Sequence, residues 1–140
     1  MSRSGYVDDL DEWAMIKWRG QVASAIKGKR GQKLLRDLIE ALDAISDKRL
    51  ITSALKDEQG EVCALGAVFK QRGISLGEPD EYDFDPEWVA SQLDVAEQLV
   101  REIAYENDEG GWRETPEDRW SRLKRWAELN LKTETKEIES

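Results

Sequence analysis

The sequence predicts a mainly α-helical fold, a single compact domain of about five or six helices, and residues 50–63 are compatible with one short β-hairpin. Apolar residues recur every three to four positions in several segments, which is the period of a helix with one buried face. Residues that typically start or stop helices flank those segments. The length of 140 residues suits one domain with one core. We assign residues 1–132 to this helical domain and expect residues 133–140 to form a frayed tail.

The first two helices should follow each other closely. The first is expected to begin near Asp8 or Asp9, whose side chains can accept free amide hydrogens, and to end at Lys27. Gly28 would then be its left-handed stop, and Gly31 would open the second helix. That second helix carries the strongest periodic pattern in the chain, made by Leu34, Leu35, Leu38, Ile39, Leu42 and Ile45. A connection this short makes the two helices antiparallel or sharply crossed.

The middle of the chain is less regular. Residues 50–63 favour either a short hairpin with Gly60 in its turn or a short helix over 52–56 followed by a loop. Residues 64–71 then predict a small helix that ends at Gly73.

A polar, strongly acidic segment separates the two halves of the chain. Gly77 and two prolines prevent regular structure over most of residues 75–87, so we expect a surface loop there. Asp85, followed by Pro86, is expected to cap the next helix. The helical pattern then breaks at Asp94, which we expect to be the N-cap of a further helix that reaches about residue 106.

Thr115 and Pro116 predict the start of the last helix. Its inward positions are expected to be Trp120, Leu123, Trp126, Ala127 and Leu131. Its basic side chains are expected to remain in solvent, and these are Arg119, Arg122, Lys124 and Arg125.

Charge is distributed unevenly along the chain, whose formal net charge is −9. Residues 13–36 hold seven bases and no acid, whereas residues 57–109 hold fifteen acids and three bases. Cations beside the free amides of a helix start suit a phosphate or a carboxylate. One candidate partner-binding surface is therefore a basic corner, formed by Trp18, Arg19, Lys27, Lys29, Arg30 and Lys33. A second candidate is an acidic loop, formed by Glu78, Asp80, Glu81, Asp83 and Asp85.

Trp13 and Trp18 are five residues apart, so they cannot both lie at the centre of one helical stripe. We expect Trp18 to be the more exposed of the two, because it stands between Lys17 and Arg19. Tryptophan beside arginine is typical of interface hot spots.

The composition argues against most catalytic chemistry. The chain has no histidine, which removes the usual general base, and a single cysteine, Cys63, which excludes a Cys/His zinc site and an internal disulfide. We expect Cys63 to be a buried structural thiol, and we expect no enzyme activity, cofactor or metal. The chain has no secretory signal pattern and no run of eighteen apolar residues, so we expect a cytoplasmic protein that does not span a membrane.

Two weaker motifs have ordinary structural interpretations. The spacing over residues 89–103 is that of a helix-turn-helix, but glutamates on its second helix would repel phosphates, so a core helix pair is favoured. Residues 106–111 offer oxygen ligands near glycines without the spacing of a calcium loop.

The chain shows a resemblance to a known group of sequences, most clearly at residues 28–44, 60–67 and 105–109. Over most of residues 4–130 the chain resembles a family of small phage and prophage proteins of proteobacteria that has no assigned activity. The resemblance implies a bacterial cytoplasm during infection, where such proteins often bind and disable host factors such as CRISPR or restriction nucleases.

The leading hypothesis is thus a non-catalytic, phage-encoded protein that inhibits or redirects a host protein, plausibly a nucleic-acid-handling defence enzyme of the kind that anti-CRISPR or anti-restriction proteins target. Its acidic loop could occupy a nucleic-acid groove, and its basic corner could bind an acidic patch. The alternative is a nucleic-acid-binding or regulatory module that uses the basic residues of 27–36 on phosphates. The oligomeric state stays open.

Overall fold

The computed structural model describes residues 12–52, 54–76, 85–111 and 113–132. Within these ranges the chain forms six helices and no strand longer than an isolated bridge, so the mainly α-helical prediction is confirmed. The helices are α1 (Glu12–Lys27), α2 (Lys29–Ala44), α3 (Ala64–Arg72), α4 (Pro86–Leu93), α5 (Glu97–Asp108) and α6 (Pro116–Asn130). The expected helix start near Asp8 or Asp9, the acidic loop over 77–84 and the tail over 133–140 lie outside the described residues.

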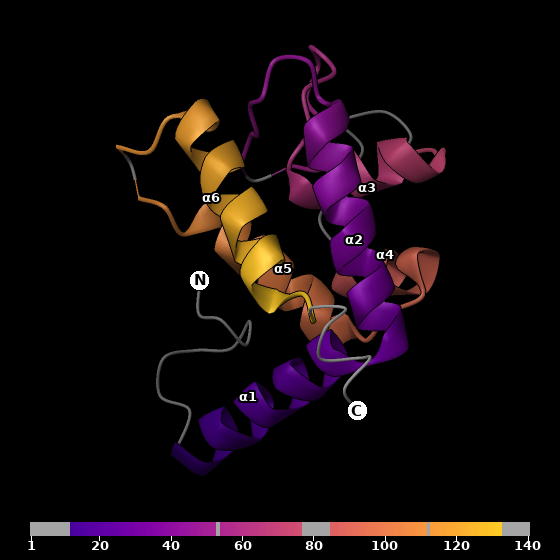
Figure 1. The fold of residues 1–140 in the computed structure, drawn as a ribbon, viewed down its shortest axis with the longest axis vertical. Coiled ribbons are helices and arrows are strands. Elements are labelled where there is room, and N and C mark those ends of the chain that lie inside the picture. Colours follow the sequence, from indigo (N-terminus) through magenta and orange to yellow (C-terminus); the bar gives the residue numbers. More distant parts are fainter. Residues whose placement is uncertain (1–11, 53, 77–84, 112, 133–140) are drawn as a thin grey trace.

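The helices surround one core, and α1 lies across one end of it. Figure 1 shows α2 and α6 running side by side, with α5 behind α6 and α3 against α2. The side chains that close this core without exposure include Leu34, Leu35, Leu38, Leu42, Phe69, Leu99 and Leu123. At the lower end of the view α1 meets α2 at a sharp corner and reaches beyond the other helices. Only α2 and α5 contact α1 extensively.

The corner between α1 and α2 differs from the prediction. Gly28 is extended rather than left-handed, with φ −70° and ψ 164°, and α2 begins at Lys29. Gly31 therefore lies inside α2, where a Cβ atom would overlap the carbonyl group of Ala25. The glycine is needed because the last turn of α1 approaches the backbone of α2 too closely for any side chain.

Gln32 joins three elements at this corner. Its buried amide nitrogen donates to the carbonyl oxygens of Ile26 at 2.7 Å and of Asn130 at 3.2 Å. Its amide oxygen accepts from the backbone N–H of Lys132 at 2.8 Å. One side chain thus satisfies polar backbone groups at the ends of α1 and α6, which would otherwise be left without partners.

Residues 50–63 form neither a full hairpin nor a helix. A single antiparallel bridge joins Lys56 to Val62, and Gly60 takes the positive φ (84°) expected of the turn. The Asp57 carboxylate accepts from two turn amides and so holds this turn. Leu55 and Val62 turn their side chains into the core and so attach this turn to the rest of the domain. Further on, α3 ends at Gly73 as predicted, with φ 72°.

Two of the three predicted N-caps that fall within the described residues are confirmed. Asp85 caps α4 through the amides of Glu87 and Trp88, and Thr115 caps α6 through the amide of Asp118. Asp94 is not an N-cap. It ends α4 in the left-handed conformation, with φ 57°, which aspartate tolerates better than most residues, and α5 begins only at Glu97.

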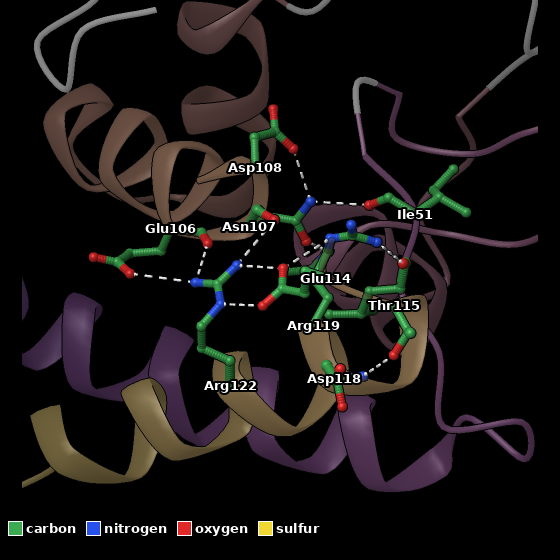
Figure 2. Close-up of polar contacts among 11 residues, drawn as sticks. Ile51, Glu106, Asn107, Asp108, Glu114, Thr115, Asp118, Arg119 and Arg122 are labelled. Atoms are coloured by element: carbon green, nitrogen blue, oxygen red, sulfur yellow. Dashed lines mark hydrogen bonds and ion pairs between the residues drawn. The ribbon is translucent and has the colours of Figure 1, made fainter. Parts of the chain in front are cut away.

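The prediction that the basic residues of α6 stay in solvent is wrong for Arg119 and Arg122, and Lys124 is also only partly exposed and pairs with Asp43 at 2.7 Å. Arg119 is only 8% exposed and donates to the carbonyl oxygen of Leu50 at 2.7 Å. Arg122 is partly buried and donates to both oxygens of Glu114, at 2.6 and 2.9 Å. Figure 2 shows this carboxylate held between the two guanidinium groups. The sequence could not reveal this, because the carboxylate arrives from the loop before the helix. Arg125 is exposed as expected.

The same cluster fixes the end of α5. Arg122 also bonds the carbonyl oxygen of Glu106, and the Asn107 amide donates to the carbonyl oxygen of Ile51 at 2.9 Å (Figure 2). The Glu114 carboxylate lies over Gly110, where a Cβ atom would overlap it. Hydrogen bonds from Arg122 lower the pKa of Glu114 below its ordinary value near 4.5.

Replacing Glu114 by glutamine should destabilise the protein at pH 7 by about 1–3 kcal/mol, since Arg119 and Arg122 lose their counter-charge while partly buried. The folded-state pKa of Glu114 is lowered, so its contribution is present above pH 4.5 and lost as the pH falls through the folded value. The stability of the glutamine variant should therefore fall less over that interval. Urea denaturation at neutral and acidic pH measures both effects. Glu40→Gln, an exposed change on α2, is the control, and equal stabilities of the Glu114 variant and wild type at pH 7 would contradict the assignment.

Replacing Gly31 by alanine should cost about 1–3 kcal/mol of unfolding free energy, because the new Cβ overlaps the backbone of α1. Gly20→Ala is the matched control, since a Cβ there meets no described atom within 4 Å. That change should stabilise α1 by about 0.5–1 kcal/mol through helix propensity. Urea midpoints at low protein concentration compare the two. If both substitutions shift the midpoint alike, the close approach at Gly31 is wrong.

Candidate partner-binding site

A pocket of about 250 Å³ opens where α1 meets α5 and the end of α6. Its lining consists of Trp18, Arg19, Val22, Ala23, Ile26, Lys27, Glu102 and Asn130. Apolar side chains from one face of α1 form much of the wall, and the exposed residues Arg19 and Lys27 bring two positive charges to it. The pocket therefore combines an apolar surface with a cationic edge.

The corner between α1 and α2 creates this pocket. Trp18, Val22 and Ile26 follow at intervals of four residues, so they share one face of α1 and point toward α5. The hydrogen bonds from Gln32 to the carbonyl oxygens of Ile26 and Asn130 then hold Asn130, at the end of α6, beside the last turn of α1. Three helices that are distant in the sequence thus contribute to one concave surface.

The expectation for the two tryptophans of α1 is reversed. Trp18 is only 9% exposed, whereas Trp13 is 72% exposed. Apolar residues occur on both faces of α1, and the sequence alone does not tell which face turns toward α5. The indole N–H of Trp18 is buried and has no hydrogen-bond acceptor among the described residues.

The structure divides the six residues of the predicted basic corner into two groups. Trp18, Arg19 and Lys27 line the pocket. Arg30 forms an exposed ion pair with Asp94 at 3.1 Å, so the carboxylate just after α4 partly neutralises it. The two remaining cations, Lys29 and Lys33, lie exposed on α2.

Asp37 neutralises part of the second group. It accepts from Lys33 at 3.2 Å and from Arg72 at 2.7 Å. Burial opposes its ionisation, but these hydrogen bonds outweigh burial and lower the pKa of its carboxyl group. Asp37 shares its single negative charge between Lys33 and Arg72, so it neutralises Lys33 only in part, whereas Arg19 and Lys27 combine with the apolar lining of the pocket.

Only one residue of the acidic loop falls within the described residues. Glu78, Asp80, Glu81 and Asp83 lie outside the described residues. Asp85 is described, and its carboxylate caps α4 at 3.1 and 3.2 Å from two amide nitrogens. Asp85 therefore has a structural role as the N-cap of α4.

Cys63 is buried, as expected. Its Sγ atom accepts from the amide of Gly66 at 3.5 Å and so caps α3. Burial raises the pKa of the thiol to about 11, which keeps it protonated at neutral pH and poorly nucleophilic.

The two weaker motifs also have structural roles. Leu93, Leu99 and Ile103 are buried where α4 packs on α5, which confirms a core helix pair. In the last turn of α5, at the start of the second motif, the Asn107 oxygen accepts from the amide of Ala64 at 3.0 Å. Across the described ranges, no three cysteine or carboxylate side chains are grouped to hold a metal ion. No helix in those ranges is long and apolar enough to cross a bilayer.

Sequence reasoning missed Glu102 and Asn130 as pocket residues. Glu102 is buried between the apolar positions Leu99 and Ile103, which marks it as an unusual acid on the inner face of α5. Asn130 carries no such signal, because only the closure of α6 onto the corner brings it there.

No model of a known protein family, no curated protein and no solved structure matches this chain. The geometry of the pocket and its charges are therefore the basis on which a function is proposed.

Proposed function

We propose that this protein is a non-catalytic interaction protein that binds a segment of another protein in the pocket between α1, α5 and the end of α6. The observation that carries this proposal is the size and lining of the pocket. Its volume of about 250 Å³ suits one large side chain and is smaller than most cofactor sites, which span roughly 300–1,000 Å³. Interface hot spots have this form, with one anchor side chain in an apolar pocket and polar groups at its rim.

The charges define the chemistry of the partner. Arg19 and Lys27 lie at the pocket, so an apolar anchor flanked by acidic side chains would match both its wall and its edge. The chain as a whole carries a charge of −9 and would repel an acidic partner elsewhere. Binding is therefore directed to this corner of the molecule.

The biological setting follows from the sequence resemblance. Small phage and prophage proteins act inside a bacterial host, so the proposed target is a host protein, and a nucleic-acid-handling defence enzyme of the CRISPR or restriction type is the favoured class. Such enzymes carry basic grooves for nucleic acid, to which the acidic loop formed by Glu78, Asp80, Glu81, Asp83 and Asp85 would be complementary. Occupation of that groove would inhibit or redirect the enzyme, and the pocket would add an anchor beside it.

A charge reversal at the pocket tests this function. Arg19→Glu should weaken binding of a target, captured from host lysate and then purified, by about tenfold or more in calorimetric titration, since a cation beside the partner's carboxylates becomes an anion. Arg36→Glu makes the same charge change on α2, outside the pocket, and should bind like wild type. Neutralising Asp80, Glu81 and Asp83 together should also weaken binding, while Asp85 is left unchanged because it caps α4. Absence of any salt-sensitive protein partner, or equal loss in both charge reversals, would count against the proposal.

The alternative function is nucleic-acid binding by the exposed cations at the start of α2. The pairing of Arg30 with Asp94 and of Lys33 with Asp37 disfavours it, so we expect no gel shift of DNA or RNA even at low salt. A shift that weakens steeply with salt and disappears in the Lys29→Ala, Arg30→Ala double variant would establish the alternative instead.

A further inference from the structure

The outward face of α1 carries apolar side chains that the rest of the described chain does not cover. Trp13 is 72% exposed and Ile16 is 51% exposed, Gly20 continues the same face, and Ala23 stands between this face and the pocket. Figure 1 shows that this helix lies at the edge of the molecule and reaches beyond its neighbours. We propose that this face pairs with the same face of a second copy of the chain, as an antiparallel helix pair about a two-fold axis near Gly20.

Gly20 supplies the first argument. Glycine inside a helix costs roughly 0.5–1 kcal/mol relative to alanine, so a reason for its presence is expected. Gly31 has such a reason within the chain, because a Cβ there would overlap the backbone of α1. At Gly20 a Cβ would meet no described atom within 4 Å, and its φ is not in the left-handed region. Close approach of a helix from another molecule accounts for a glycine at this position.

The shapes on the two sides of Gly20 are complementary under a two-fold axis. If Gly20 faces its own copy in an antiparallel pair, Ile16 lies beside Ala23 and Ser24 of the second copy. Large side chains then lie against small ones on both sides of the axis, which is how the ridges of one helix fill the grooves of another. The same pairing occurs twice, as an isologous interface requires.

Charge selects the antiparallel direction. Glu12 is the one acidic residue of α1 and stands in its first turn, and Lys27 stands in its last turn. In the antiparallel pair, Glu12 and Trp13 lie beside Lys27 of the second copy, so an ion pair and a cation–π contact form at each end. A parallel pair would instead place Lys17 and Lys27 beside their own copies.

The dimer should be weak and should border the pocket at one side of α1. α1 has 16 residues and is therefore about 24 Å long. One helix pair of that length falls below the roughly 1,200–2,000 Å² buried in stable complexes, so association should depend on concentration. Trp18 and Val22, in the pocket, lie on the opposite side of α1 from Trp13 and Gly20, whereas Ala23 and Lys27 belong both to the pocket lining and to the proposed contact, so the second copy would border each pocket there.

Sedimentation equilibrium over micromolar to submillimolar concentrations tests the association. Wild type should pass from monomer to dimer mass, and Ile16→Glu should weaken association by about tenfold or more, because it places a carboxylate in the contact. Leu129→Glu is the matched control, since Leu129 is 76% exposed but lies on α6, and this variant should dimerise like wild type. Circular dichroism verifies that each variant is folded.

The direction and register have their own tests. Gly20→Cys should form a disulfide-linked dimer with oxidised glutathione, whereas Leu129→Cys should not, and the native thiol at Cys63 is buried in both. Glu12→Lys and Lys27→Glu should each weaken the dimer, and the double variant should restore it.

Three outcomes would overturn the proposal. One is a wild-type protein that remains monomeric at every concentration. If a variant without residues 1–11 then dimerises, the outward face would be assigned to that segment instead of to a second copy. The second is a dimer unaffected by Ile16→Glu. The third is a dimer that Gly20→Cys fails to cross-link, which would exclude the antiparallel register. Because Ile16 is outside the pocket, these results are independent of the Arg19 test of partner binding.

Discussion

The close contact between α1 and the start of α2 fixes the features of this protein that bear on function. Gly31 lets the carbonyl of Ala25 approach the backbone of α2, and Gln32 then bonds backbone groups at the ends of α1 and α6. Both effects are geometric, since one needs the absence of a Cβ atom and the other needs one amide within reach of two chain ends. Together they hold α1 across the end of the core instead of along it. An α1 that ran along the core would bury the residues that now form the pocket and the outward face.

The opposite end of the core depends on charge. Glu114 accepts from Arg122 and lies beside Arg119, and these two arginines also donate to carbonyl groups at the end of α5 and to that of Leu50. In a strongly acidic chain, arginine inside the structure joins loops that contribute few apolar side chains. Such a cluster fixes geometry more than it adds net stability, because desolvation offsets much of the attraction between the charges.

With the corner between α1 and α2 and the Glu114 cluster holding the two ends of the core, both long faces of α1 are accessible for interactions. One face contributes Trp18 and Val22 to a pocket with a cationic edge, and the other presents Trp13 and Ile16 to solvent. Small proteins seldom expose large apolar side chains together on one helix face without an interaction that uses them. Binding of a partner on one side and self-association on the other would give a two-fold molecule with two separate pockets. Such an assembly would gain avidity for a target that repeats its binding segment.

The sequence by itself determined the helices whose signals are local. The leucine spacing of α2, the caps at Asp85 and Thr115, and the stop at Gly73 need only nearby residues, and the structure confirms them. The basic corner was also visible, because a charge count requires no fold.

The tertiary structure decided which face of each helix is buried and which charges find partners. The burial of Trp18 instead of Trp13 and the inward position of Arg119 both depend on neighbours far away in the chain. The pocket is of the same kind, because Glu102 and Asn130 reach it only when α5 and α6 close on α1. A helical period in the sequence predicts that a helix has an apolar face. Where a helix has two apolar faces, the packing of the whole core decides which one is buried.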